Sequence, residues 1–137
     1  MRVLALDYGE KRIGVALSDP LGLSAQPYPF ISNDDQKWRQ IQEKLTEYEI
    51  QTVVVGLPKN RDGGETEKSG EVRAFAQELE SKLGVTVVFW DERFSTVAAQ
   101  KHLISANLRR DQRKNVIDSQ AACFILQGYM DRMKNQL

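Results

Sequence analysis

Residues 3–18 read VLALDYGEKRIGVALS, with two apolar runs on either side of a short polar turn. This pattern, with Gly9 inside the turn, predicts a β-hairpin. A single carboxylate, Asp7, stands where the first strand meets the turn. In a strand buried on both faces, an ionised side chain costs several kcal/mol unless it has a partner. Asp7 therefore either caps its own turn or holds a cation, and the hairpin alone leaves both interpretations open.

The composition indicates one compact domain. The chain has 137 residues, 41% of them hydrophobic, which is enough for a proper core but too short for two substantial lobes. Its 19 basic and 19 acidic side chains cancel. We therefore expect a single domain over residues 1–137, in which any binding of nucleic acid comes from a local basic patch.

The sequence has no pattern typical of a membrane or secreted protein. No uninterrupted apolar run approaches the ~20 residues of a membrane span, and the first residues do not read as a secretory leader. The one cysteine, Cys123, cannot form an internal disulfide, which agrees with a reducing compartment. We expect a cytoplasmic protein with no membrane partner, in which Cys123 is a small buried side chain.

The segment after the hairpin predicts an edge strand and then a helix. Leu23 to Ile31 is broken by Pro27 and Pro29, so a strand here should be short and lie at an edge of the sheet. Asn33 can cap the following helix, and Gln36 can complete a capping box. The helix should turn one apolar face inward, consisting of Trp38, Ile41, Leu45 and Tyr48.

The middle of the chain alternates strand and helix. Residues 52–57 form a β-branched run that predicts a buried parallel strand, followed by a turn-rich loop at 58–64. Residues 85–90 predict a second buried strand. The intervening helix, which Gly84 should end, has an apolar face of Val72, Phe75, Ala76, Leu79 and Leu83. The chain is therefore predicted to be an α/β protein.

The last third predicts two helices separated by a basic segment. Ser95 can cap the first helix, whose apolar residues are Val97, Leu103, Ile104 and Leu108. The second helix should run from about Val116 to Met133. Asp118 lies on the same helical stripe as the apolar residues Ala121, Ala122, Ile125 and Tyr129.

Three acidic positions stand at the ends of elements that should be core. They are Asp7, the pair Asp91 and Glu92, and Asp118. Parallel strands place their carboxyl ends at one edge of a sheet, and a helix packed there can add a third carboxylate. Each acid alone can equally be a cap, a turn residue or half of a salt bridge; Glu92, for example, can pair with Arg93 or Lys101.

A cluster of three carboxylates requires a cation. Two carboxylates ~4 Å apart repel by about 4 kcal/mol at an effective dielectric near 20. Oxygen ligands without histidine or cysteine favour Mg²⁺ or Mn²⁺. Two such ions bridged by an acid would activate a water and stabilise the leaving oxygen of a phosphodiester.

Several motifs resemble one family, and the match spans essentially the whole chain. The motifs are Asp7-Tyr8-Gly9, residues 11–16, Val55-Gly56-Leu57-Pro58, residues 91–96, and Asp118 before an alanine-rich helix. They resemble the YqgF (RuvX) family of Holliday junction resolvase-like nucleases, which are implicated in maturation of precursor 16S rRNA. The resemblance implies an RNase H-like fold, with a central mixed sheet of antiparallel first strands and then parallel strands, flanked by helices.

The resemblance also implies the site. Asp7 would be a metal ligand, the Asp91–Glu92 pair would supply a second, and Asp118 a third. Adjacent strand residues face opposite sides, so only one member of the pair should face the metal, and we favour Glu92 as the longer arm. Asp91 is kept as a candidate catalytic residue.

Basic side chains would surround the acids and contact phosphates without reading sequence. They are Lys11, Arg12, Lys59, Arg61, Arg93, Arg109, Arg110, Arg113 and Lys114. The expected partners are structured RNA or branched DNA, together with pre-ribosomal particles. The protein is expected to act as a monomer or a homodimer.

The function that we favour is a metal-dependent endonuclease of the two-metal-ion type, which processes the 5′ end of precursor 16S rRNA. The alternatives are a Holliday junction resolvase acting on branched DNA and a non-catalytic RNA-binding factor of ribosome assembly. A third class, the sugar-kinase and actin ATPases, also has an Asp-x-Gly phosphate loop, but it clamps nucleotide between two lobes, for which 137 residues are too few.

Overall fold

The computed structural model describes residues 2–94 and 119–135, which form one five-stranded sheet with helices on both faces. The strands are β1 (Val3–Tyr8), β2 (Arg12–Ser18), β3 (Ala25–Ser32), β4 (Thr52–Leu57) and β5 (Thr86–Asp91), in the order β3-β2-β1-β4-β5. β1, β2 and β3 are antiparallel, whereas β4 and β5 run parallel to β1. The predicted mixed α/β sheet is confirmed.

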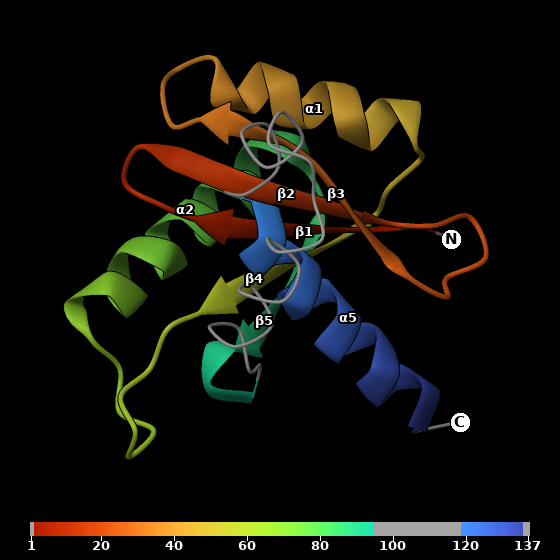
Figure 1. Cartoon of the computed structure of the whole chain (residues 1–137). Coiled ribbons are helices and arrows are strands. Elements are labelled where there is room, and N and C mark those ends of the chain that lie inside the picture. Colours follow the sequence, from red (N-terminus) through yellow and green to blue (C-terminus); the bar gives the residue numbers. More distant parts are fainter. Residues whose placement is uncertain (1, 95–118, 136–137) are drawn as a thin grey trace, which may run out of the picture.

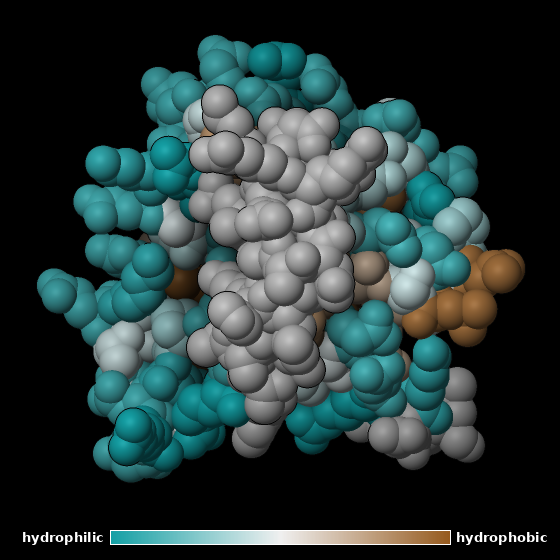
Figure 2. Space-filling model, viewed as in Figure 1, coloured by the Kyte–Doolittle hydropathy of each residue, from teal (hydrophilic) through white to brown (hydrophobic). Residues whose placement is uncertain are grey.

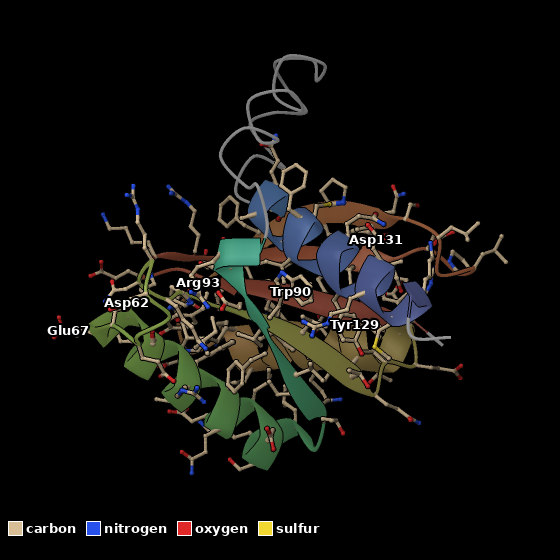
Figure 3. The ribbon with its side chains drawn as sticks, turned by 90° about the horizontal axis from the view of Figure 1, so that it is seen from below. Asp62, Glu67, Trp90, Arg93, Tyr129 and Asp131 are labelled. Carbon is tan, nitrogen blue, oxygen red and sulfur yellow. The ribbon has the colours of Figure 1, made fainter. Side chains whose placement is uncertain are left out.

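Helices cover the two faces of the sheet unequally. Among the helices of the described residues, α1 (Lys37–Glu47) and α2 (Glu67–Leu83) pack on one face, and α5 (Gln120–Asn135) crosses the other (Figures 1 and 3). The short helix η1 (Glu92–Phe94) follows β5 directly. The side chains of β1 alternate between two cores: Leu4 and Leu6 join the core under α1 and α2, while Ala5 joins the core under α5.

Small residues allow α5 to lie close to the sheet. Ala5 and Ala16 from the sheet are fully buried beneath Ala122 of the helix. A Cβ atom on Gly128 would lie 2.8 Å from Cζ2 of Trp90, so this glycine makes room for the indole ring. The predicted inward stripe of the last helix is confirmed for the residues from Ala121 onward.

The third strand lies at the edge of the sheet, as predicted, but it is not short. β3 has eight residues and includes both prolines. An edge strand pairs on one side only, so proline is tolerated wherever its missing N–H would face away from the ladder. The register between β2 and β3 shifts between Ile13 and Val15, where β3 carries one extra residue as a bulge.

Ser119 fills this break in the ladder. Its buried hydroxyl accepts a hydrogen bond of 2.9 Å from the backbone N–H of Val15 and donates to the carbonyl of Tyr28. Val15 and Tyr28 are opposite one another in the sheet, so the hydroxyl bridges the two strands beside the bulge. The start of α5 is thereby attached to β2 and β3.

The predicted capping role of Asn33 was wrong. α1 begins at Lys37, and its N-cap, Gln36, makes no side-chain capping bond. The Asn33 amide instead donates to the carbonyl of Gly9 over 2.8 Å, and its backbone N–H donates to the carbonyl of Lys11 over 2.9 Å. Asn33 therefore bonds the β1–β2 turn, which is distant in sequence, instead of the backbone at the start of α1.

α2 shows both helix signals at its ends. Thr66 and Ser69 form a capping box at its start. Gly84 ends the helix in the left-handed conformation at φ 67°, which confirms the prediction for this glycine. The predicted helix after Ser95, and the predicted start of the last helix with Asp118, lie outside the described residues. No helix in the described ranges is long and apolar enough to cross a membrane.

We predict that Ser119→Ala lowers the free energy of unfolding by about 1–3 kcal/mol, because buried backbone groups of β2 and β3 lose their partner. Urea denaturation followed by circular dichroism measures this change. The matched control is Ser81→Ala on α2, which removes only an exposed hydroxyl bonded to the carbonyl of Glu78. A loss no larger than that of the control would contradict the bridging role.

We also predict that Cys123 is inert in the folded protein. Burial raises the pKa of its thiol to about 12, whereas the thiolate is the reactive form. At pH 8 a disulfide reagent should label the native protein at least about a hundredfold more slowly than the urea-unfolded protein. Rapid labelling of the native chain would show that this part of α5 opens readily.

Candidate active site

Asp7 ends the first strand on the face that α5 covers. Side chains alternate along β1, so Asp7 shares its face with Ala5, while Tyr8 points the other way and stacks near Phe75 at 4.6 Å between ring centroids. Its Cα partner on the neighbouring strand is Gly14. The Asp7 carboxylate is therefore half-buried at the carboxyl end of β1, beneath the beginning of α5.

Glu92 reaches the same face from the other side of β4. A Cβ atom on Gly56 would lie 2.7 Å from Oε1 of Glu92 and 2.5 Å from Cδ1 of Ile125. The Glu92 side chain therefore extends over β4 and occupies the space that any larger residue at position 56 would take. Leu6 pairs with Val55, so the next residues along, Asp7 and Gly56, are neighbours across the two strands. The Asp7 and Glu92 side chains thus both lie beside the position where Gly56 lacks a side chain.

Asp91 faces the opposite side. It pairs with Leu57, and the series Val87, Phe89 and Asp91 lies on the α2 face. Its carboxylate accepts hydrogen bonds from the Arg93 guanidinium, the closest over 2.7 Å. That hydrogen bond is the main cause that lowers the pKa of Asp91 below its ordinary value, so the carboxyl stays ionised well into acid.

The third predicted acid, Asp118, lies outside the described residues. Within residues 2–94 and 119–135 no group of three His, Cys, Asp or Glu residues could hold a metal. The chain neighbour of Asp118 is Ser119, which is bonded to Val15. Val15 follows Gly14, the strand partner of Asp7, so the described start of α5 lies beside the end of β1.

Two basic loops extend from this edge of the sheet (Figure 1). Lys11, in the β1–β2 turn, and Arg12, the first residue of β2, are exposed; a Cβ on Gly9 in this turn would collide with the carbonyl of Arg12. The loop after β4 carries Lys59, which is half-buried, and Arg61, which is exposed. Figure 2 shows that this side of the molecule is hydrophilic.

The apolar surface lies elsewhere. The exposed hydrophobic side chains Leu21 and Leu23, 79% and 59% exposed, belong to the β2–β3 turn at the opposite end of the sheet (Figure 2). The edge that carries Asp7 and Glu92 is therefore the polar, partly basic end of the described molecule.

The remaining basic residues divide into two groups. The Arg93 guanidinium binds Asp91 and also donates to the carbonyl of Arg61 over 3.2 Å. Arg109, Arg110, Arg113 and Lys114 lie outside the described residues.

Sequence reasoning missed two residues of the site. Gly56 interrupts a run of β-branched residues, and an isolated glycine in a strand is a signal of close approach by another group. Ser119 gave no comparable signal, because the bulge that it bridges lies in a strand far earlier in the chain: Tyr28 precedes Ser119 by 91 residues.

Comparison with known proteins adds independent information. A model of the RuvX family, described as Holliday junction resolvase, matches residues 1–132. A relative from Desulforamulus reducens is 44% identical over 133 residues, covering 96% of this chain and 97% of the relative. One from a Geobacillus species is 46% identical over 135 residues, covering 96% and 98%. Both relatives are named as candidate pre-16S rRNA nucleases.

Two solved structures share the fold. RuvC of T. thermophilus in complex with a Holliday junction substrate aligns with a TM-score of 0.61 at 17% identity, covering 98% of this chain and 96% of that one. The fowlpox virus Holliday junction resolvase aligns with a TM-score of 0.56 at 16% identity, covering 96% and 99%. The RNase H-like architecture implied by the sequence motifs is thereby confirmed. On the whole-length family match and the close relatives, this chain belongs to the RuvX family.

Proposed function

We propose that this protein is a metal-dependent endonuclease that processes the 5′ end of precursor 16S rRNA. One observation carries the proposal: the Glu92 side chain extends over Gly56, the residue of β4 that neighbours Asp7 of β1. Two carboxylates from distant parts of the chain therefore lie on the same face of the sheet, beside the same residue. The close relatives, which are named for cleavage of this RNA, support the choice of substrate.

The residues fit a hard divalent cation. Asp7 and Glu92 offer carboxylate oxygens, which Mg²⁺ and Mn²⁺ prefer. The missing Cβ at Gly56 allows the Glu92 carboxylate to lie over β4, on the side of the sheet that Asp7 faces. We assign the third ligand to Asp118, because its neighbour Ser119 is anchored beside the strand partner of Asp7. When bound, a pair of these ions would supply an activated water and stabilise the leaving oxygen.

The remaining chemistry belongs to the protein. Lys11, Arg12, Lys59 and Arg61 hold the phosphates on either side of the scissile bond, because both of their loops leave the edge that bears the acids. Arg109, Arg110, Arg113 and Lys114 complete this set in the proposal. The buried Ile125 side chain lies beside the Glu92 carboxylate over Gly56 and would limit the access of water from that side. Such contacts follow the backbone of the nucleic acid rather than its sequence, so the shape of the substrate selects it.

Branched DNA is the second candidate substrate. The family description and the fold shared with two resolvases favour it. Symmetric cleavage of a junction requires a two-fold dimer, whereas trimming of an RNA end requires only one subunit. For the RNA reaction we propose pre-ribosomal particles as partners, in the cytoplasm.

We predict that Asp7→Asn lowers cleavage of precursor 16S rRNA in Mg²⁺ or Mn²⁺ by at least about a hundredfold, because it removes a ligand charge while keeping the shape. Gel analysis of end-labelled RNA, beside a four-way DNA junction, measures the loss and identifies the substrate. Asp131→Asn is the matched control, because Asp131 is exposed near the C-terminal end of α5, the end opposite to Ser119.

Three outcomes of this experiment are distinct. Loss on RNA supports the proposal, and loss on the junction alone would select the second candidate. Binding of RNA that survives in both variants, with no turnover by the wild type, would identify a non-catalytic assembly factor and refute the nuclease.

We predict that Gly56→Ala lowers the rate of cleavage at least about tenfold, because its Cβ would displace Glu92 and Ile125. It should also destabilise the fold by about 1–3 kcal/mol through overpacking. Gly70→Ala on α2 is the matched control: nothing lies within 4 Å of its Cβ, and it should leave the rate unchanged. Single-turnover kinetics with thermal unfolding separates the two effects, and an unaltered rate in Gly56→Ala would refute the placement of Glu92.

A further inference from the structure

The residues on either side of Glu92 are bonded to each other. The Asp91 carboxylate accepts the backbone N–H of Arg93 over 2.9 Å and its guanidinium Nε over 3.0–3.1 Å, in addition to Nη2 over 2.7 Å. The Asp91 side chain is only 12% exposed and that of Arg93 32%. Two interactions therefore close the turn that carries Glu92: the hydrogen bond from the Arg93 backbone N–H to the Asp91 carboxylate, and the forked ion pair between the two side chains.

The same guanidinium also holds the loop after β4. Arg93 Nη1 donates to the carbonyl of Arg61, and a Cβ on Gly63 would lie 3.3 Å from that nitrogen. Gly63 has φ +90°, a conformation that favours glycine, so the loop is shaped to pass close to the guanidinium. Figure 3 shows Arg93 beside this loop, with Asp62 at the loop's outer side.

The other side of the loop is attached to α2. The Arg73 guanidinium binds the Glu65 carboxylate over 2.6 and 2.7 Å, and the Ser69 hydroxyl donates to the carbonyl of Pro58. The loop thus has two anchors, one on a helix and one on the turn of Glu92. The anchor on α2 is a forked arginine–carboxylate pair, whereas the anchor on the turn is the hydrogen bond from Arg93 to the carbonyl of Arg61. Only the Arg93 anchor touches the turn that bears a proposed metal ligand.

The charges near this pair keep it ionised. Arg93 lowers the pKa of Asp91, and Lys59 adds to that effect. Asp91, and to a lesser degree Asp62, raises the pKa of Arg93. The guanidinium thus has partners within the protein at three of its nitrogens, Nε, Nη1 and Nη2, although its side chain is partly exposed.

We propose that Asp91 and Arg93 are positioning residues, which fix the turn that aims Glu92 across Gly56 and couple it to the loop bearing Lys59 and Arg61. This inference rests on the proposed nuclease function. Asp91 then acts on the face opposite Asp7 and is not a metal ligand, and Arg93 is not a phosphate contact. The reason is structural: a helix of three residues has little stability of its own, so the direction of Glu92 depends on the side-chain pair that closes the turn.

The test compares the two anchors of the loop. Arg93→Gln releases the loop and also opens the turn, whereas Arg73→Gln releases the loop from α2 only. We expect Arg93→Gln to lower kcat about tenfold or more, and Arg73→Gln to raise KM while kcat stays within about twofold. Equal effects of both variants on kcat would overturn the proposal.

Amide hydrogen exchange gives a readout independent of activity. Arg93→Gln should speed exchange about tenfold at residues 92–94 and at 59–64, while Arg73→Gln should do so only at 59–64. Unchanged exchange at 92–94 in Arg93→Gln would overturn the proposal. If the wild type cleaves neither RNA nor DNA, the nuclease assignment fails, and the exchange data still test the link between turn and loop.

A second variant covers the case in which Arg93→Gln does not fold. Asp91→Asn keeps an acceptor for the backbone N–H of Arg93 and removes only the charge of the pair. It should lower kcat by a smaller factor than Arg93→Gln, with faster exchange at 59–64. An unaltered kcat and unaltered exchange in Asp91→Asn would overturn the proposal.

Discussion

The absence of a side chain at Gly56 is the constraint on which the candidate site depends. A sheet covered by helices is close-packed, and every strand position on a covered face normally carries an atom that fills it. At Gly56 the space is filled instead by the side chains of Glu92 and Ile125, which belong to η1 and α5. Three elements therefore meet over one residue of β4, and the carboxylate of β1 lies next to that meeting point.

The position of α5 has a different origin. Alanines on both surfaces and Gly128 bring the helix close to the sheet, and Ser119 fixes where it begins. The hydroxyl of Ser119 bridges backbone groups at a bulge that an edge strand containing two prolines creates. An irregularity in β3 thus sets the start of a helix on the covered face, and the start of that helix lies beside the end of β1.

Basic residues lie at the same edge of the sheet as the candidate site. The chain as a whole carries no net charge, so it has no general attraction for a polyanion. The β1–β2 turn and the loop after β4 place basic residues at the same edge as the acids, and these loops are fixed by Asn33 on one side and by Arg73 and Arg93 on the other. In the proposed reaction, these cations would hold phosphates while a divalent ion balances the half-buried carboxylates of Asp7 and Glu92.

The sequence by itself determined the order of strands and helices along residues 2–94, the mixed sheet and the family, whereas its choice of acids stays a prediction. Each of these follows from local patterns: the alternation within residues 3–18, the β-branched run of β4, and motifs that keep their spacing. Local patterns failed where a distant partner decided the outcome. Asn33 looked like a helix cap but bonds the β1–β2 turn, and β3 is long because its edge position tolerates both prolines. Only the tertiary structure decided that Glu92 and Asp91 face opposite sides, that Gly56 makes room for Glu92 and Ile125, and that Ser119 attaches α5. These facts depend on contacts between segments that are far apart in the chain.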